Sequence, residues 1–274
     1  MVGGTSTVVD HEGGGFSWRE AGVDRASLPI LLLHGLTGSR LSWEPQLVAL
    51  CADRRVAAWD LPGYGQSTPA DPSLGFRGLA DAVVRWCDEL GAPRVHLAGL
   101  SFGGMIAQYT AVYHPDRVAS LALLATSPKF GLDGTKPDEW RAARLAPLDE
   151  GQQPIDFAPR VMRAIAGPHI MPDALQGQIA AAARVPADGL RASIEVLITH
   201  DSRPLLPSIT APTIVVVGEL DGETPVAYAQ ALADGIPGAA LHVVAGAGHL
   251  LNVEAPDAVT DLLRRHADDH EGRR

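Results

Sequence analysis

The stretch Gly99-Leu100-Ser101-Phe102-Gly103 stands between an apolar run, Val95–Ala98, and a segment with helical spacing, Gly104–Tyr113. A G-x-S-x-G between a strand and a helix turns the chain sharply and exposes the serine hydroxyl at the end of the strand. The flanking glycines remove side chains that would collide with the neighbouring strand and helix. The stretch therefore predicts a nucleophilic serine, Ser101, in an α/β fold.

Two other interpretations of this stretch have less support. A glycine-rich turn can hold a serine that has no chemical role, but such a turn does not require a strand before it and a helix after it. A phosphate-binding loop would need G-x-x-x-x-G-K-[ST] or G-x-G-x-x-G, and Gly99, Gly103 and Gly104 fit neither pattern.

Around this stretch, short apolar runs alternate with longer amphipathic segments, which is typical of βαβ units and a mostly parallel sheet. The runs predicted as buried strands are Ile30–Leu33, Arg55–Trp59, Val95–Ala98 and Val118–Leu124. The segments predicted as helices between them are Trp43–Cys51, Leu79–Leu90 and Gly104–Tyr113. Upstream, Thr5–Asp10 and Phe16–Glu20 flank three glycines and predict an antiparallel hairpin at the edge of the sheet.

The alternation stops after Ala125 and resumes near residue 210. Residues 126–209 are rich in Ala, Arg and Pro, with helical pieces at Asp138–Leu145 and Leu175–Ala183, and we interpret them as a helical cap inserted after the sixth strand. Residues 1–125 and 210–274 then form one α/β core. The last units predicted in this core are strands Pro212–Gly218 and Ala240–Val244, with helices at Pro225–Ala233 and Ala255–His266.

The composition limits the classes of partner. The formal net charge is −10, which argues against a nucleic-acid partner because phosphate binding needs clustered Lys and Arg. Met1–Gly15 lacks the pattern of a signal peptide, and the longest apolar runs are too short to span a membrane. The two cysteines, Cys51 and Cys87, have no CxxC spacing. We expect a cytoplasmic protein with a small-molecule substrate, and a homo-oligomer is left open.

A serine hydroxyl needs a base to remove its proton, and His249 is the best candidate among ten histidines. It ends the glycine-rich segment Ala245-Gly246-Ala247-Gly248-His249, directly after the last predicted strand, so it would reach the same sheet edge as Ser101. The remaining histidines fall in strands, at a helix end, in the cap, near the termini, or, for His34, in a loop that this residue braces.

The acid that orients the histidine is expected between Ser101 and His249 in chain order, after the strand Thr213–Val217. Asp221 fits this position, and Glu219 and Glu223 are nearby alternatives. Such a carboxylate would hold the imidazole in one tautomer and stabilise the imidazolium that forms. An ordinary loop aspartate is the other interpretation of Asp221.

Attack on a carbonyl creates an oxyanion, which two backbone N–H groups usually receive. The segment His34-Gly35-Leu36-Thr37-Gly38 follows the first parallel strand, so the Leu36 amide is one predicted donor and the Phe102 amide is the other. The stretch Asp60–Ser67 is interpreted as a structural loop. No His, Cys or carboxylate group has the spacing of metal ligands, so neither a metal nor another cofactor is expected.

Taken together, these residues resemble the α/β-hydrolase superfamily. The resemblance rests on several motifs in order: His34-Gly35, Asp60-Leu61-Pro62-Gly63-Tyr64-Gly65, Gly99–Gly103, Gly218–Asp221 and Gly248-His249. It implies a mostly parallel central sheet flanked by helices, an inserted cap, and a serine hydrolase. An aspartate in place of Ser101 would have suggested a dehalogenase or an epoxide hydrolase instead.

Within the superfamily, the sequence is most similar to 3-oxoadipate enol-lactonases. The similarity lies in Gly99–Met105, His114–Arg117 and Gly248–Glu254, and Trp140 is similar to a cap tryptophan of that group. The resemblance implies hydrolysis of a small lactone or ester that bears a carboxylate. A cap arginine would meet this carboxylate, and the candidates are Arg141, Arg144 and Arg163.

Other activities share the same three residues. Carbon–carbon bond hydrolases of ring-cleavage products typically carry an aromatic residue after the histidine, whereas Leu250 stands there in this chain. A general carboxylesterase and a perhydrolase are further alternatives. A non-catalytic ligand-binding protein is the alternative from another class, since a fold alone does not fix a function.

Overall fold

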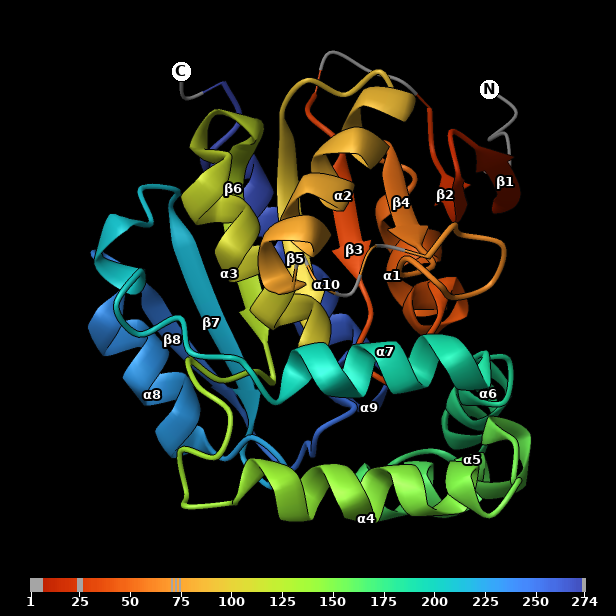
Figure 1. Cartoon of the computed structure of the whole chain (residues 1–274). Coiled ribbons are helices and arrows are strands. Elements are labelled where there is room, and N and C mark those ends of the chain that lie inside the picture. Colours follow the sequence, from red (N-terminus) through yellow and green to blue (C-terminus); the bar gives the residue numbers. More distant parts are fainter. Residues whose placement is uncertain (1–6, 24–26, 70, 72, 74, 273–274) are drawn as a thin grey trace.

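Eight strands form one mixed sheet in the order β1-β2-β4-β3-β5-β6-β7-β8 (Figure 1). The computed structural model describes residues 7–23, 27–69, 71, 73 and 75–272. The strands are β1 (Val9–Gly13), β2 (Phe16–Ala21), β3 (Ile30–Leu33), β4 (Val56–Trp59), β5 (Val95–Leu100), β6 (Val118–Leu124), β7 (Thr213–Gly218) and β8 (Ala240–Val244). The first two strands form an antiparallel hairpin, β2 runs antiparallel to β4, and all other neighbours are parallel. The fold is therefore the predicted α/β architecture with a mostly parallel sheet.

The hairpin differs slightly from the prediction. Its first strand was expected within Thr5–Asp10, but β1 begins at Val9 and runs to Gly13; Thr5 lies outside the described residues. Gly14 and Gly15 have φ angles of 56° and 84° and make the turn, so the strands pair directly up to Gly13 and Phe16. The glycines fix the register because a tight hairpin turn with positive φ favours glycine.

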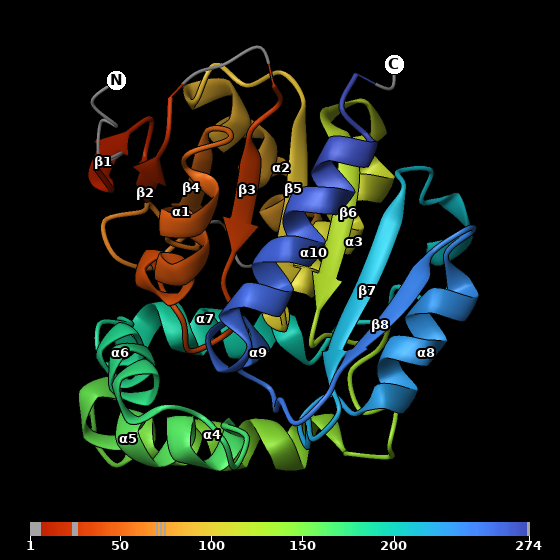
Figure 2. The same ribbon diagram turned by 180° about the vertical axis from the view of Figure 1, so that it is seen from behind.

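Helices cover both faces of the sheet (Figures 1 and 2). α1 (Glu44–Leu50) and α10 (Pro256–Asp269) lie on one face, and α2 (Gly75–Glu89), α3 (Phe102–Tyr113) and α8 (Val226–Gly235) lie on the other. Side chains of β3 alternate between the two cores: Leu31 and Leu33 pack with α2 and α3, whereas Ile30 and Leu32 pack with α1 and α10. A strand buried on both faces therefore has a continuous apolar run, as expected for a parallel sheet.

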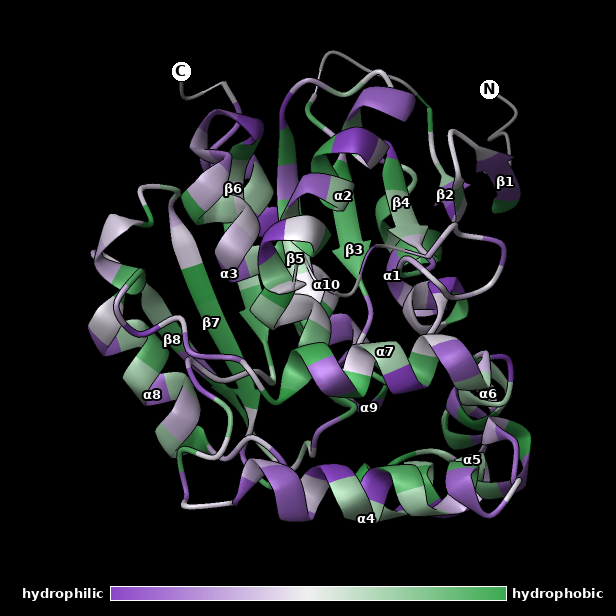
Figure 3. Cartoon of the chain, viewed as in Figure 1, coloured by the Kyte–Doolittle hydropathy of each residue, from purple (hydrophilic) through white to green (hydrophobic). Residues whose placement is uncertain are grey.

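Four helices between β6 and β7 lie across the carboxyl ends of the strands (Figures 1 and 2). They are α4 (Pro137–Asp149), α5 (Pro154–Ile165), α6 (Pro172–Ala182) and α7 (Ala187–Leu197). Apolar and polar residues alternate along these helices, whereas the central strands are mostly apolar (Figure 3). In α5, for example, Phe157, Ala158 and Met162 are buried while Ile155 is exposed. Within the described part of the chain, no helix is long and apolar enough to cross a membrane.

Candidate active site

Ser101 occupies a strained turn between β5 and α3. Its φ and ψ angles are 54° and −117°, a conformation that residues other than glycine rarely adopt. Three hydrogen bonds hold its backbone: its N–H donates to Leu124 O (2.9 Å), and its carbonyl accepts from Thr126 Oγ1 (2.8 Å) and Met105 N (3.0 Å). The neighbouring structure therefore stabilises a backbone conformation that directs the Ser101 side chain out of the sheet edge.

The two glycines of the motif are required by close backbone approach. A Cβ atom on Gly99 would lie 2.3 Å from the carbonyl oxygen of Gly103, and one on Gly103 would lie 2.3 Å from the carbonyl oxygen of Leu33. Any side chain at either position would push β5, β3 and α3 apart. The G-x-S-x-G pattern is thus explained by the sharpness of the turn that carries Ser101.

Asp221 and His249 lie together at the same sheet edge, in the loops that follow β7 and β8. The Nδ1 atom of His249 is 3.0 Å from Oδ2 and 3.1 Å from Oδ1 of Asp221. The side chain of Asp221 is 0% exposed and that of His249 is 8% exposed. The Asp221 Oδ1 atom also accepts the N–H groups of Glu223 and Thr224, each at 2.9 Å. These two amides therefore fix the position of the carboxylate independently of its contact with the histidine.

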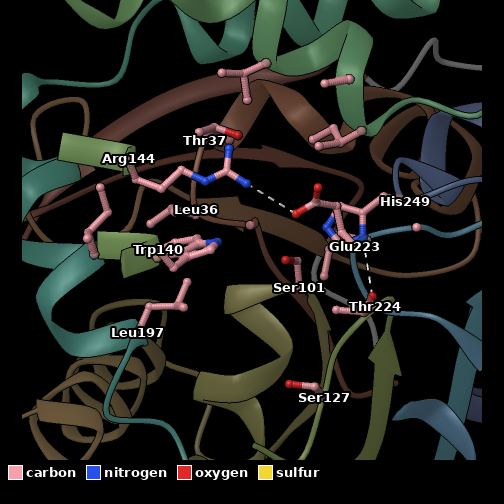
Figure 4. A pocket seen from close by; sticks show the side chains of 18 of the residues that line it. Leu36, Thr37, Ser101, Ser127, Trp140, Arg144, Leu197, Glu223, Thr224 and His249 are labelled. Carbon is pink, nitrogen blue, oxygen red and sulfur yellow. Dashed lines mark hydrogen bonds and ion pairs between the residues drawn. The ribbon is translucent and has the colours of Figure 1, made fainter. Parts of the chain in front are cut away.

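Sequence reasoning missed Thr224. Its hydroxyl donates to Asp221 Oδ2 (2.8 Å). The same hydroxyl lies 3.4 Å from His249 Nδ1 (Figure 4). The available signal was the spacing Asp-x-x-Thr, since an aspartate often accepts hydrogen bonds from residues two and three positions later in a turn. Thr224 thus holds the side of the carboxylate that faces the imidazole.

Burial and charge oppose each other in this pair. Burial of the His249 ring disfavours its charged form, but the charge of Asp221 and its hydrogen bond outweigh burial and raise the pKa of His249. Burial also disfavours the ionised form of Asp221, yet His249 and the two hydrogen bonds from Thr224 keep the pKa of Asp221 below its ordinary value. The ion pair is therefore the favoured state whenever His249 carries a proton.

Ser101 and His249 line one cavity of about 650 Å³ between the sheet edge and the cap (Figure 4). Within the described part of the chain, no hydrogen bond joins the Ser101 hydroxyl to the imidazole. Catalytic hydrogen bonds are often long in an enzyme without substrate and shorten when substrate binds. The structure thus brings the serine, the histidine and, behind the histidine, the aspartate to one site.

The two amides expected to receive an oxyanion flank Ser101. The Phe102 N–H is at the first position of α3, where no helical acceptor precedes it, and Leu36 lines the cavity from the loop after β3. Among the described residues, neither amide donates to another group. His34 and Tyr64 both brace this loop. His34 Nε2 accepts from Leu61 N (3.0 Å), and Tyr64 Oη donates to Leu36 O (2.8 Å).

The cap residues expected to contact substrate divide into two groups. Trp140 and Arg144 line the cavity, and the Arg144 guanidinium lies 5.1 Å from the centre of the Trp140 ring. Arg141 does not line it: its guanidinium pairs with Glu195 at 2.6 Å, and about two fifths of its side chain is exposed. Arg163 is also outside the lining and donates to Pro159 O. Of the three cap arginines expected to meet a substrate carboxylate, the structure therefore places Arg144 in the cavity lining and Arg141 and Arg163 outside it.

The alternative acids have other partners. The Glu219 carboxylate accepts from Gly246 N (2.9 Å), and the Glu223 carboxylate lies 3.6 Å from the Arg144 guanidinium (Figure 4). Neither forms a hydrogen bond with His249 in the described structure. Asp221 is thus the carboxylate that contacts the histidine.

Comparisons with known proteins identify the family to which this fold belongs. Residues 29–256 match the sequence family described as "alpha/beta hydrolase fold". The chain is 34% identical to a pimeloyl-[acyl-carrier protein] methyl ester esterase of Chromobacterium violaceum, over 79% of this chain and 83% of that protein. It is 29% identical to 3-oxoadipate enol-lactonase 2 of Acinetobacter baylyi, over 85% and 86% of the two chains. The structure of the enol-lactonase from Burkholderia xenovorans LB400 is similar with a TM-score of 0.83 and 26% identity, covering 95% of this chain and 100% of that one.

Proposed function

This chain belongs to the alpha/beta hydrolase fold family and is a hydrolase, and on that premise we propose that it cleaves a carboxylic ester or lactone through a serine acyl-enzyme. One observation carries the proposal: Ser101, in its strained turn, lines the same cavity as a histidine whose Nδ1 atom is held by a buried aspartate. This is the arrangement that activates a serine hydroxyl.

In the first half of the reaction, His249 Nε2 takes the proton of the Ser101 hydroxyl while Oγ attacks the substrate carbonyl. The Leu36 and Phe102 amides donate to the oxyanion of the tetrahedral intermediate. The bond between the carbonyl carbon and the ester oxygen then breaks, and His249 gives the proton to the leaving oxygen. The product of this half is an acyl-Ser101 ester and an alcohol, which in a lactone stays attached to the acyl group.

In the second half, His249 takes a proton from water, and the hydroxide oxygen attacks the acyl carbon. The same two amides stabilise the second oxyanion, and the bond to Ser101 Oγ breaks as Oγ recovers the proton. The acid is released. Throughout the cycle, Asp221 remains ionised and stabilises the imidazolium without taking the proton.

The lining of the cavity supports a substrate that is mainly apolar and carries one anionic group. Apolar side chains such as Leu36, Trp140 and Leu197 line much of it. Cationic side chains outnumber acidic ones in the lining, which includes Lys129, Arg144 and Arg160 against Asp133 and Glu223. Three cationic side chains thus line a cavity in a chain whose net charge is −10, and they are the groups that would attract an anionic substrate there.

Within this lining, we assign the contact with a substrate carboxylate to Arg144. Its distance of 3.6 Å from Glu223 is longer than a direct hydrogen bond, so the guanidinium has N–H donors left for a ligand. Trp140 holds the guanidinium from one side. Because the 3-oxoadipate enol-lactonase is among the relatives, a small carboxylate-bearing lactone is the first substrate to test.

A fluorophosphonate probe tests the mechanism, because it labels a serine only when a base activates it. We expect peptide mapping to find the label on Ser101, and Ser101→Ala to abolish both labelling and hydrolysis of p-nitrophenyl acetate. The matched control is Ser208→Ala, since Ser208 is an exposed serine in the short helical turn Leu206–Ser208 and does not line the cavity. Labelling of another residue, or full turnover by Ser101→Ala, would contradict the mechanism.

A substrate panel separates the remaining activities. We expect hydrolysis of esters and lactones and no cleavage of a ring-opened aromatic diketone, which a carbon–carbon bond hydrolase would consume.

The two cysteines, Cys51 and Cys87, are buried free thiols, which supports the cytoplasm as the proposed location.

A further inference from the structure

The loop that carries His249 is held by a residue that has no place in the mechanism above. Glu254 ends the short helix α9 (Leu251–Glu254), which directly follows this loop. Its Oε2 atom accepts the N–H of Gly248 (2.6 Å), and its Oε1 atom accepts the N–H of Leu250 (2.9 Å). The amides immediately before and after His249 thus both donate to one carboxylate.

The same carboxylate also binds the cap. Its Oε1 atom accepts a third N–H, from Gly167 in the segment between α5 and α6 (3.1 Å). The N–H of His249 itself donates to Ile165 O, at the end of α5 (3.3 Å). Three consecutive amides of the histidine loop are therefore held by Glu254 or by the cap.

Close packing supports this link between cap and core. A Cβ atom on Gly248 would lie 2.5 Å from Gly167 N, and one on Gly167 would lie 2.7 Å from Gly248 N and 2.2 Å from Glu254 Oε2. The two backbones therefore touch, and both positions need glycine for lack of space. Leu250 and Val253 add an apolar contact with Ala158 and Met162 of α5.

We propose that Glu254 is a positioning residue that fixes the His249 imidazole relative to Ser101 by joining the histidine loop to the cap at Gly167. The inference rests on the proposed role of His249 as the base. An ionised carboxylate accepts three N–H donors at once, whereas an amide has one accepting oxygen and would turn its NH₂ group toward a donor. No neutral side chain of the same shape can replace Glu254.

Electrostatics adds a second effect of the same residue. The negative charge of Glu254 contributes to the raised pKa of His249, after the larger effects of burial, which opposes the rise, and of Asp221 and Glu223, which favour it. Loss of the charge should therefore lower the pKa of the base, and a merely structural residue would leave it unchanged.

The test compares Glu254→Gln and Glu254→Asp with the wild type on p-nitrophenyl acetate, and measures fluorophosphonate labelling rates and thermal unfolding. For Glu254→Gln we expect kcat and the labelling rate to fall about 10- to 100-fold, since a misplacement near 1 Å has an effect of this size. KM should change little, and the acid limb of the pH profile should move to lower pH. Glu254→Asp keeps the charge but not the reach, so its acid limb should match the wild type while kcat falls.

Glu219→Gln is the matched control. The Glu219 carboxylate also accepts an N–H from the loop after β8, that of Gly246, but this hydrogen bond does not join the loop to the cap. This variant should keep kcat within about twofold, as expected for an exposed hydrogen bond. If Glu254→Gln does not fold, Gly167→Ala moves the same carboxylate from the cap side and should give the same loss of kcat.

The outcomes separate this inference from the proposed function. The inference alone is overturned if Glu254→Gln has the kcat, labelling rate and pH profile of the wild type, because Glu254 would then be only a structural residue. If Glu254→Gln is unfolded, the same result in both Glu254→Asp and Gly167→Ala overturns it. Absence of hydrolysis by the wild type, or undiminished hydrolysis by Ser101→Ala, would overturn the proposed function and this inference with it.

Discussion

His249 Nδ1 lies 3.0 Å from Asp221 Oδ2, although the two residues are separated by a helix and a strand of the core. The low pKa of Asp221 keeps its carboxylate ionised, so it can only accept and Nδ1 must donate. The proton of neutral His249 is therefore on Nδ1, and Nε2 presents its lone pair to the cavity. The aspartate thus selects the tautomer that a general base requires.

Asp221→Asn should lower kcat by about 10³- to 10⁴-fold, because it reverses this tautomer. The side-chain oxygen of the introduced asparagine would stay with the amides of Glu223 and Thr224, so its NH₂ group would face His249 Nδ1. Nδ1 would then accept, and Nε2 would carry a proton toward Ser101. Steady-state hydrolysis of p-nitrophenyl acetate measures the effect, and a loss of less than tenfold would show that another group orients the base.

The pH profile of kcat/KM should have an acid limb above pH 6.5. The base must be neutral to take the Ser101 proton, and Asp221 raises the pKa of His249 above its ordinary value despite burial. Activity is therefore present above this raised pKa and is lost as the pH falls through it. Measurement of kcat/KM from pH 5 to 9 checks the prediction, and a plateau that extends unchanged to pH 5.5 would contradict it.

Most strands could be predicted to within two residues because they are buried on both faces and have continuous apolar runs. The cap was less predictable. α5 and α7 were not recognised as separate helices, and α4 continues to Asp149 although Pro147 suggests an earlier end. Pro159 likewise lies inside α5. A proline removes one helical hydrogen bond, and the packed cap tolerates that loss in a way that local sequence does not reveal.

The order of motifs was enough to select Ser101, Asp221 and His249 for one site, because the carboxyl ends of parallel strands share a sheet edge. Contacts that depend on the path of a loop were not predictable, as Thr224 and Glu254 show. The different positions of the two cap arginines have a simpler origin. Arg144 is four residues after Trp140 and shares its face of α4, whereas Arg141 is one residue after it and points elsewhere.

Ser101→Gly should be more stable than Ser101→Ala by about 1 kcal/mol, although both are inactive. Glycine adopts the φ of 54° without steric cost, whereas alanine keeps the strain of the serine. Glycine also has more conformational freedom in the unfolded chain, which reduces this gain. Urea unfolding of the two variants measures the net difference in their free energies of unfolding. Equal unfolding free energies would mean that the turn stores no strain.

Asp60→Asn should lower the free energy of unfolding by about 2 kcal/mol, because the buried Arg40 guanidinium loses its buried partner and keeps only the half-exposed Asp10. Asp60 also accepts from Arg40 N and Ser17 Oγ, which anchors the loop after β4. The control is Asp53→Asn, which breaks an exposed pair with Arg264 and should lower it by less than about 1 kcal/mol. Equal losses in the two variants by thermal unfolding would contradict this difference.

Arg144→Met should raise KM at least about tenfold for an ester with a remote carboxylate, since a charged hydrogen bond contributes about 1.5 to 3 kcal/mol. A neutral ester of the same shape should be little affected, because methionine keeps most of the apolar contact with Trp140. Arg141→Met is the matched control: it removes an arginine from the same helix, but one that pairs with Glu195 outside the cavity. Equal increases in KM for the charged and the neutral ester would mean that Arg144 shapes the cavity without selecting an anion.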